Sequence, residues 1–161
     1  IPYILHGMEA GIIASQLTNT HGVIDEEVVA AAILHDTMED AFVTYETLVE
    51  LFNERIAKLV QSQSEDKTKS WQERKEATLE LLRQNESEAV EITTLADKLS
   101  NMRAIARDYA ELKDGLWSKF NAGKEQQQWY YSSLGSAFKF VTHTPAYQEY
   151  QSLVQQVFQS E

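Results

Sequence analysis

Apolar residues recur at intervals of three and four along most of this chain, the spacing that places them on one face of an α-helix. The first such stripe predicts a helix over residues 5–18 and consists of Ile4, Leu5, Met8, Ile12 and Ile13. Only six glycines and two prolines interrupt the chain, so few helix breakers are present. The pattern therefore predicts an all-α fold with no sheet of consequence.

Residues that favour helix N-termini mark where further helices begin. Asp25, Thr44 and Thr144 each stand just before an apolar-periodic segment, and Ser70 with Glu73 forms the capping-box pattern. The remaining helices are expected over residues 26–36, 44–52, 54–63, 70–84, 85–109 and 124–140, and from 145 onward. The polar residues 64–70 predict a loop, and residues 113–115 and 121–123 predict breaks.

The length of 161 residues fits one domain, 1–161, in which residues 116–161 form the C-terminal helices. Because the sequence begins with Ile1 rather than Met, its N-terminus is expected to be truncated. The sequence contains neither a run of about 18 apolar residues nor a signal peptide. We therefore expect a cytoplasmic protein with no membrane partner.

The net charge and the absence of cysteine limit which partners the protein can bind and which side chains can hold a metal ion. A net charge of −11 repels a polyanion, so no nucleic acid partner is expected, whereas a small phosphorylated substrate needs a metal ion and local cations to attract it. The chain has no cysteine, which excludes disulfides and thiolate ligands. A metal must therefore be held by histidine nitrogen and carboxylate oxygen.

Four titratable residues follow the apolar run 28–34 within six positions: His35, Asp36, Glu39 and Asp40. In a continuing helix, Glu39 would lie over His35 and Asp40 over Asp36. Buried imidazole and carboxylate groups are costly unless they pair or bind a cation, and a divalent ion would relieve the repulsion among the three acids. The alternative is a solvated helix end, because a His-Asp pair alone is a weak metal signal.

Asp97 is a candidate ligand from a distant segment, ITTLADKLSNMRAI. It lies next to the apolar face of its predicted helix, an unusual place for an unpaired carboxylate, and Asn101 is one turn further on the same face. The alternative is an acid on the polar flank of the helix, paired with Lys98 or Arg103.

The three histidines other than His35 are weak evidence for a metal site when each is considered alone. His6 lies near the apolar stripe of the first predicted helix, where a core histidine is the ordinary interpretation. His21 stands in a turn beside a glycine, and His143 stands in a threonine-rich turn before a proline. We expect both of these at the surface and assign them no role.

In their order and spacing, the segments PYILH, AAILHDTMED and TLADKLSNMRAI resemble the HD superfamily of metal-dependent phosphohydrolases. They are most similar to the hydrolase domain of RelA/SpoT-type proteins and to the small alarmone hydrolases. The resemblance covers roughly residues 1–110. Three departures stand out: Gly7 replaces the usual proline, the basic segment that precedes PYIxH in the family is absent, and the region after Gly115 matches poorly.

The resemblance implies an HD-domain helical bundle and assigns roles to individual residues. One Mn²⁺ would be held by His6, His35, Asp36 and Asp97, with Fe, Mg, Ni or Zn as alternatives. Glu39 and Asp40 would be catalytic, because acids one turn away are suited to orient or deprotonate a water. The candidate substrate contacts are Asn101, Arg103, Lys67, Arg74 and Lys75. Asn101 and Arg103 could instead support the metal ligands, and the other three also fit a solvated loop and helix face.

The activity implied by the resemblance is hydrolysis of the 3′-pyrophosphate from guanosine 3′,5′-bis(diphosphate), the alarmone of the stringent response. One alternative is another HD-type nucleotide phosphohydrolase, such as a deoxynucleoside monophosphatase. A second is a non-catalytic metal- or nucleotide-binding regulatory module, against which the intact Glu39 and Asp40 argue. The nucleotidyltransferase domain that makes alarmones has no counterpart in this sequence.

Overall fold

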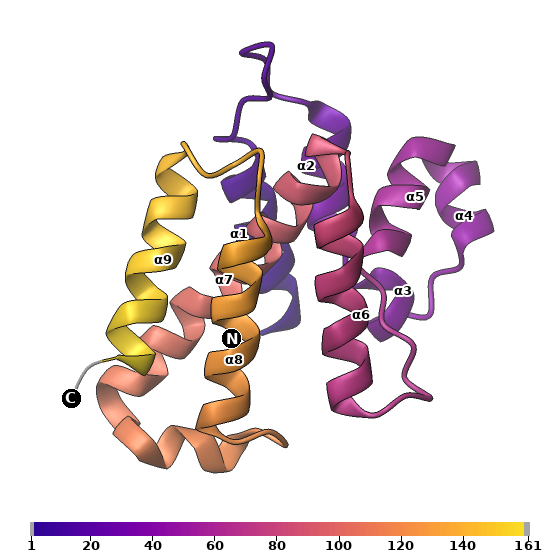
Figure 1. Ribbon diagram of the computed structural model, residues 1–161. Coiled ribbons are helices and arrows are strands. Elements are labelled where there is room, and N and C mark those ends of the chain that lie inside the picture. The colour runs from indigo at the N-terminus through magenta and orange to yellow at the C-terminus, as the bar shows by residue number, and fades with distance from the viewer. Residues whose placement is uncertain (1, 160–161) are drawn as a thin grey trace.

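The computed structural model describes residues 2–159, which fold into helices joined by short loops (Figure 1). The helices are α1 (Tyr3–Ala14), α2 (Glu26–Leu34), α3 (Thr37–Asp40), α4 (Tyr45–Leu51), α5 (Glu54–Ser62), α6 (Trp71–Gln84), α7 (Glu88–Leu112), the 3₁₀ helix η1 (Lys113–Lys119), α8 (Lys124–Ala137) and α9 (Pro145–Phe158). The extended pairing among these residues is limited to one isolated bridge, between Thr18 and Ile24. The predicted all-α class is therefore confirmed.

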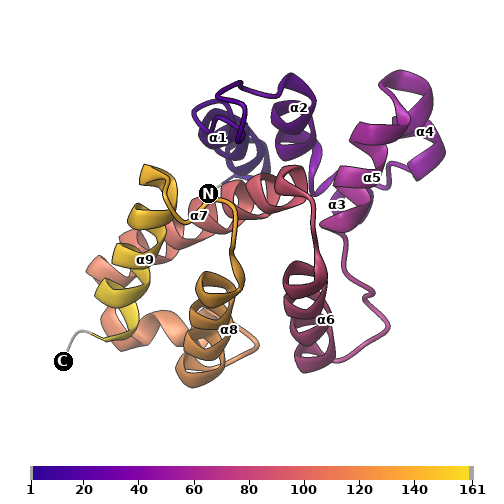
Figure 2. The same ribbon diagram turned by 45° about the horizontal axis from the view of Figure 1, so that its top comes forward.

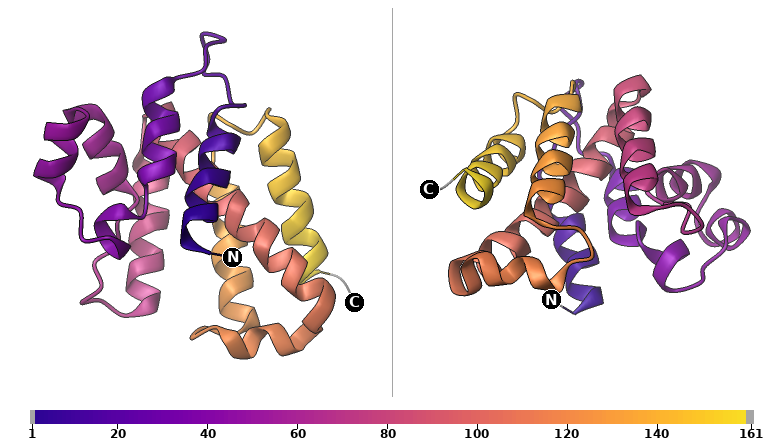
Figure 3. Two further views of the ribbon diagram at one scale, coloured as in Figure 1. Left: turned by 180° about the vertical axis from the view of Figure 1, so that it is seen from behind. Right: turned by 60° about the horizontal axis from the view of Figure 1, so that its bottom comes forward.

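The longest helix, α7, is the centre of the fold. It packs against α1, α2, α5 and α9, and Figure 2 shows it running between the pair α1–α2 and the pair α6–α8. Seen from behind in Figure 3, α1 lies between α2 and α9. Leu95, Leu99 and Met102 of α7 are at most 1% exposed. A residue on this helix can therefore meet side chains from both ends of the sequence.

Most helix starts agree with the predicted caps because capping depends on local chemistry. The helix predicted over 85–109 is an exception, since α7 is capped by Ser87 and spans Glu88–Leu112. The Asp25 side chain accepts the backbone N–H groups of Glu27 and Val28, and Ser70 with Glu73 makes a complete capping box. Helix ends agree less well. The first helix spans Tyr3–Ala14 instead of 5–18, α2 stops at Leu34, and α8 stops at Ala137 instead of residue 140. The break predicted at 113–115 is instead the start of η1.

The apolar stripe predicted for α1 does not form its packing face. Ile4, Met8 and Ile12 are 61%, 51% and 56% exposed, whereas Ile13 is 2% exposed. An apolar stripe ordinarily faces the core, but here the buried residues of the helix are mostly small: Ala10, Gly11, Ile13 and Ala14. The hydrophobicity pattern was therefore wrong about the orientation of α1, because close backbone approach selects small residues instead of large ones.

Two glycines make this close approach between α1 and α2. A Cβ atom on Gly7 would lie 2.8 Å from the backbone carbonyl oxygen of Ile33, and one on Gly11 would lie 2.4 Å from the Cγ1 atom of Ile33. Such contacts are shorter than packed atoms tolerate, so the absence of a side chain at both positions sets the distance between the helices. His6 stands next to Gly7, and its position depends on this packing.

Gly7→Ala is accordingly expected to destabilise the protein by about 1–3 kcal/mol, the usual cost of overpacking. The added methyl group meets backbone, which cannot turn away as a flexible side chain can. Urea denaturation followed by circular dichroism measures the change. Gly115→Ala is the matched control, because a Cβ atom there meets nothing within 4 Å. Equal stability of the two variants would contradict the packing argument.

Among the described residues, no helix combines the length and the apolar character needed to cross a membrane.

Candidate metal centre

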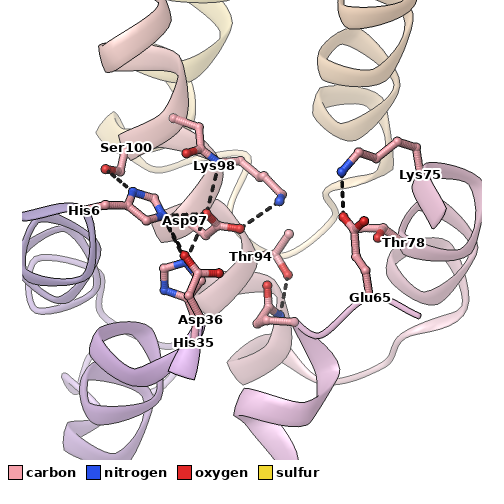
Figure 4. A network of polar contacts seen from close by, with 12 residues as sticks. His6, His35, Asp36, Glu65, Lys75, Thr78, Thr94, Asp97, Lys98 and Ser100 are labelled. Atoms are coloured by element: carbon pink, nitrogen blue, oxygen red, sulfur yellow. Dashed lines mark hydrogen bonds and ion pairs between the residues drawn. The ribbon is translucent and has the colours of Figure 1, made fainter. Parts of the chain in front are cut away.

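Three side chains from distant parts of the sequence meet beside α7 (Figure 4). His6 comes from α1, His35 caps the C-terminus of α2, and Asp97 lies in the middle of α7. His6 Nε2 is 3.0 Å from His35 Nε2 and 3.1 Å from Asp97 Oδ1, and His35 Nε2 is 3.2 Å from the same Asp97 oxygen. These donor atoms lie within 4.8 Å of one another and could hold a metal ion.

The second nitrogen of each imidazole is held by a neighbouring oxygen. His35 Nδ1 lies 2.7 Å from the carbonyl oxygen of Ala32, to which it donates, and His6 Nδ1 lies 2.8 Å from Ser100 Oγ. Hydrogen bonds of this kind fix ring orientation and tautomer, leaving Nε2 as the coordinating atom. Ser100 was missed by the sequence analysis, although it stands one turn from Asp97 on the same helix.

The two oxygens of Asp97 have different partners. Oδ2 is 2.8 Å from Lys98 Nζ, while Oδ1 faces the two histidines and accepts a hydrogen bond from Asn101 Nδ2 at 3.1 Å. Burial alone would raise the pKa of Asp97, but Lys98 and His35 hold the pKa well below its usual value. Asp97 is therefore an ionised carboxylate with Oδ1 directed into the cluster, and Asn101 lies on the same face as predicted.

Asp36 approaches the cluster from its more open side. Its Oδ2 atom is 3.1 Å from His35 Nε2 and 3.6 Å from His6 Nε2, and its side chain is 29% exposed. Since α2 stops at Leu34 and Asp36 precedes α3, the one-turn stacking expected for a continuous helix does not apply. A hollow of about 120 Å³ opens here, lined by His35, Asp36 and mostly apolar side chains.

The nitrogen and oxygen atoms of this cluster would be stabilised by a cation between the two imidazoles. Burial by itself would lower the pKa of His35, but the carboxylates of Asp97 and Asp36 outweigh it and raise the pKa to about 10. Two Nε2 lone pairs 3.0 Å apart repel each other unless a proton or a metal ion lies between them. Imidazole nitrogen with carboxylate oxygen suits divalent first-row metals, so these residues fit such an ion.

The two acids predicted to be catalytic, Glu39 and Asp40, are the last two residues of the short helix α3. Glu39 has a side chain 20% exposed, and its Oε1 atom accepts a hydrogen bond from the backbone N–H of Glu65. Asp40 is more open, at 47%. Lys67 Nζ lies 3.6 Å from Asp40 Oδ1 and 4.0 Å from Glu39 Oε2. The loop between α5 and α6 thus supplies both an N–H donor and an ammonium group to these acids.

The other predicted substrate cations already face carboxylates. Lys75 Nζ is 2.6 Å from Glu65 Oε1, and an Arg74 nitrogen is 3.4 Å from Glu65 Oε2. Arg103 makes a two-pronged contact with Glu149 of α9, at 2.7 and 2.8 Å. The pattern of charges along the sequence could not reveal these partners. Glu65, the partner of Lys75 and Arg74, lies in a loop, and Glu149, the partner of Arg103, lies in a helix far along the sequence.

His21 and His143 are exposed, as expected from their turns.

The sequence has curated relatives. A guanosine-3′,5′-bis(diphosphate) 3′-pyrophosphohydrolase MESH1 from Danio rerio is 36% identical over 106 residues, which are 66% of this chain and 57% of that protein. A guanosine-3′,5′-bis(diphosphate) 3′-pyrophosphohydrolase from Aquifex aeolicus is also 36% identical over 106 residues, 65% of this chain and 14% of that protein. The chain therefore spans less than two thirds of the length of these relatives.

Solved structures share the fold over almost the whole chain. The crystal structure of lmo0812 from Listeria monocytogenes matches with a TM-score of 0.84 and 30% identity, covering 96% of this chain and 99% of that one. A metazoan SpoT ortholog described as hydrolysing ppGpp matches with a TM-score of 0.75 and 24% identity, covering 96% and 81%, and this likeness concerns the fold alone. Residues 1–127 match the HD domain family. By this match and by its fold, the chain belongs to the HD domain family.

Proposed function

We propose that this chain is a metal-dependent phosphohydrolase that removes the 3′-pyrophosphate from guanosine 3′,5′-bis(diphosphate). The observation that carries the proposal is the meeting of His6 Nε2, His35 Nε2 and Asp97 Oδ1 at one point. Relatives that bear this activity in their names, at 36% identity, support the choice of substrate. The family to which the chain belongs supports hydrolysis as the reaction.

The proposed metal ligands are His6, His35, Asp36 and Asp97, and the proposed ion is Mn²⁺. Nitrogen and oxygen donors suit Mn²⁺ and equally Fe, Mg, Ni or Zn. When bound, such an ion supplies Lewis-acid chemistry, polarising a phosphoryl oxygen and making water more acidic. Asp36 belongs in the set because its Oδ2 atom lies within 3.6 Å of both imidazoles.

The remaining groups act on water and substrate. Glu39, held by the N–H of Glu65, keeps its second oxygen for accepting a proton from the attacking water, and Asp40 is the alternative base. Lys67 is 58% exposed and can turn to a substrate phosphate, a charge-assisted contact. Asn101 acts by holding Asp97 Oδ1. Arg103 would have to break its ion pair with Glu149 to reach a substrate. We therefore propose that it holds α7 against α9 and does not bind substrate.

We further propose that residues 1–161 form one domain, since α9 packs along α7 and α8 packs against α6 and α9. Cytoplasmic localisation and a small phosphorylated nucleotide as the substrate, with no nucleic acid or membrane partner, belong to the same proposal.

Metal binding is expected to release about one proton per ion near neutral pH, because a ligand imidazole must be neutral. With a pKa raised to about 10 in the metal-free chain, His35 is protonated at pH 7, so the apparent affinity for Mn²⁺ rises as the pH rises. Isothermal titration calorimetry in buffers of different ionisation enthalpy counts the protons. A binding enthalpy independent of the buffer would show that His35 carries no proton to displace.

The decisive assay for the function incubates the protein with Mn²⁺ and a panel of nucleotides and separates the products by anion exchange. Release of pyrophosphate from the alarmone supports the proposal. Inorganic phosphate from deoxynucleoside monophosphates, with the alarmone untouched, would move the assignment to the monophosphatase alternative. Tight metal or nucleotide binding without turnover would identify a regulatory module.

A further inference from the structure

Glu65, in the loop that joins α5 to α6, forms ion pairs with two cations of α6. Its side chain is 15% exposed and makes a 2.6 Å contact with Lys75, whose side chain is 16% exposed, and a 3.4 Å contact with Arg74. Figure 4 shows Glu65 and Lys75 directed at each other across the space between the loop and α6. Both cations belong to the second turn of α6, so the carboxylate ties the loop to a rigid helix.

The same loop touches the candidate reaction centre through its backbone and through Lys67. The backbone N–H of Glu65 donates to Glu39 Oε1, and Lys67 lies 3.6 Å from Asp40 Oδ1. At the start of the loop, Gln63 Nε2 donates to Thr94 Oγ1 at 3.1 Å. Thr94 stands about one turn before Asp97 on α7, so the loop is also tied to the helix that carries the proposed metal ligand.

We propose that Glu65 is a positioning residue for catalysis: its ion pair with Lys75 and Arg74 fixes the loop whose N–H and Lys67 hold Glu39 and Asp40 in place. This inference rests on the proposed function. It changes the interpretation of Lys75 and Arg74, which the sequence suggested as phosphate ligands. Both instead act through Glu65, because their charged groups contact its carboxylate.

The energetics make Glu65 and Lys75 dependent on each other. Burial and the nearby charge of Lys98 lower the pKa of Lys75, and the carboxylate of Glu65 opposes that shift. Removing one partner of a largely buried pair leaves the other charge uncompensated, so either single substitution releases the loop. Two residues that act through one contact show non-additive effects.

The test compares Glu65→Gln, Lys75→Met and the double variant with Glu54→Gln, which breaks the exposed Glu54–Lys58 pair of 2.9 Å. We expect both single variants to lose about 10²-fold in kcat, as a displaced catalytic group does. KM should rise much less than kcat falls, because neither Glu65 nor Lys75 itself contacts the substrate in this proposal. The double variant should be no worse than the poorer single one, Lys75→Arg should recover most of the rate, and Glu54→Gln should match wild type.

A substrate contact by Lys75 would give a different result: a raised KM in Lys75→Met with Glu65→Gln close to wild type. That outcome, or additive losses in the double variant, overturns the proposal. Hydrogen–deuterium exchange of the Glu65 amide gives a readout independent of activity, and it should quicken in both single variants and not in Glu54→Gln. If wild type released no product from any nucleotide, the proposed function would fail, and unchanged exchange would separately refute the role of Glu65.

Discussion

Asp97→Ala is expected to abolish Mn²⁺ binding and hydrolysis together. The substitution removes Oδ1, the oxygen that both imidazoles face at 3.1 and 3.2 Å, and deletes the partner of Lys98. A largely buried lysine without its counter-charge is destabilising, by about 3–5 kcal/mol in comparable pairs. Calorimetric titration with Mn²⁺ and product release from the alarmone measure the two losses.

Asp97→Asn separates loss of the ligand from loss of the fold, because the amide keeps the shape of the side chain. We expect it to be more stable than Asp97→Ala, because its amide oxygen can still accept a hydrogen bond from Lys98, while it still fails to bind the ion. Asp108→Ala, at an acid 53% exposed on the same helix, is the matched control and should retain both properties. Wild-type affinity for Mn²⁺ in Asp97→Asn would exclude Asp97 as a ligand.

Glu39→Gln should retain metal binding but lower the rate of hydrolysis by about 10²–10⁴-fold, the usual contribution of general acid–base catalysis. The amide still accepts the hydrogen bond from Glu65, so the loop keeps its place, but glutamine cannot take a proton from water. Single-turnover kinetics with saturating Mn²⁺ measure the chemical step directly.

Glu46→Gln, an exposed acid on the neighbouring helix α4, controls for loss of a negative charge and should turn over normally. Normal turnover in Glu39→Gln itself would leave Asp40 as the base. A loss of metal in that variant would instead place Glu39 among the ligands.

The helical fold could be predicted from local information, and the site only from motif order. Capping by Asp25 and Ser70 depends on a few neighbouring residues, so those helix starts were predicted correctly. Nothing local distinguishes His6 from an ordinary core histidine, or Asp97 from an acid paired with Lys98. The pairing of Asp97 with Lys98 does occur, through one carboxylate oxygen, while the other oxygen faces the histidines.

What the sequence could not predict depends on packing between distant segments. The orientation of α1 was wrong because Gly7 and Gly11 decide how closely two helices approach, which the hydrophobicity of Ile4 or Met8 does not reveal. The charges of Arg74, Lys75 and Arg103 were visible, but their partners were not. Arg103 reaches Glu149, 46 positions away, in a region that the motifs do not cover.

The cluster at α7 also has a thermodynamic consequence. His6 and Asp97 are separated by 91 positions, and His6 and His35 by 29, so the donor atoms meet only after α1 and α2 have packed on α7. The unfolded chain cannot present this arrangement. An ion bound there therefore acts as a removable cross-link between the N-terminal helices and the middle of the sequence. It stabilises the native state in proportion to the logarithm of its concentration once that exceeds Kd.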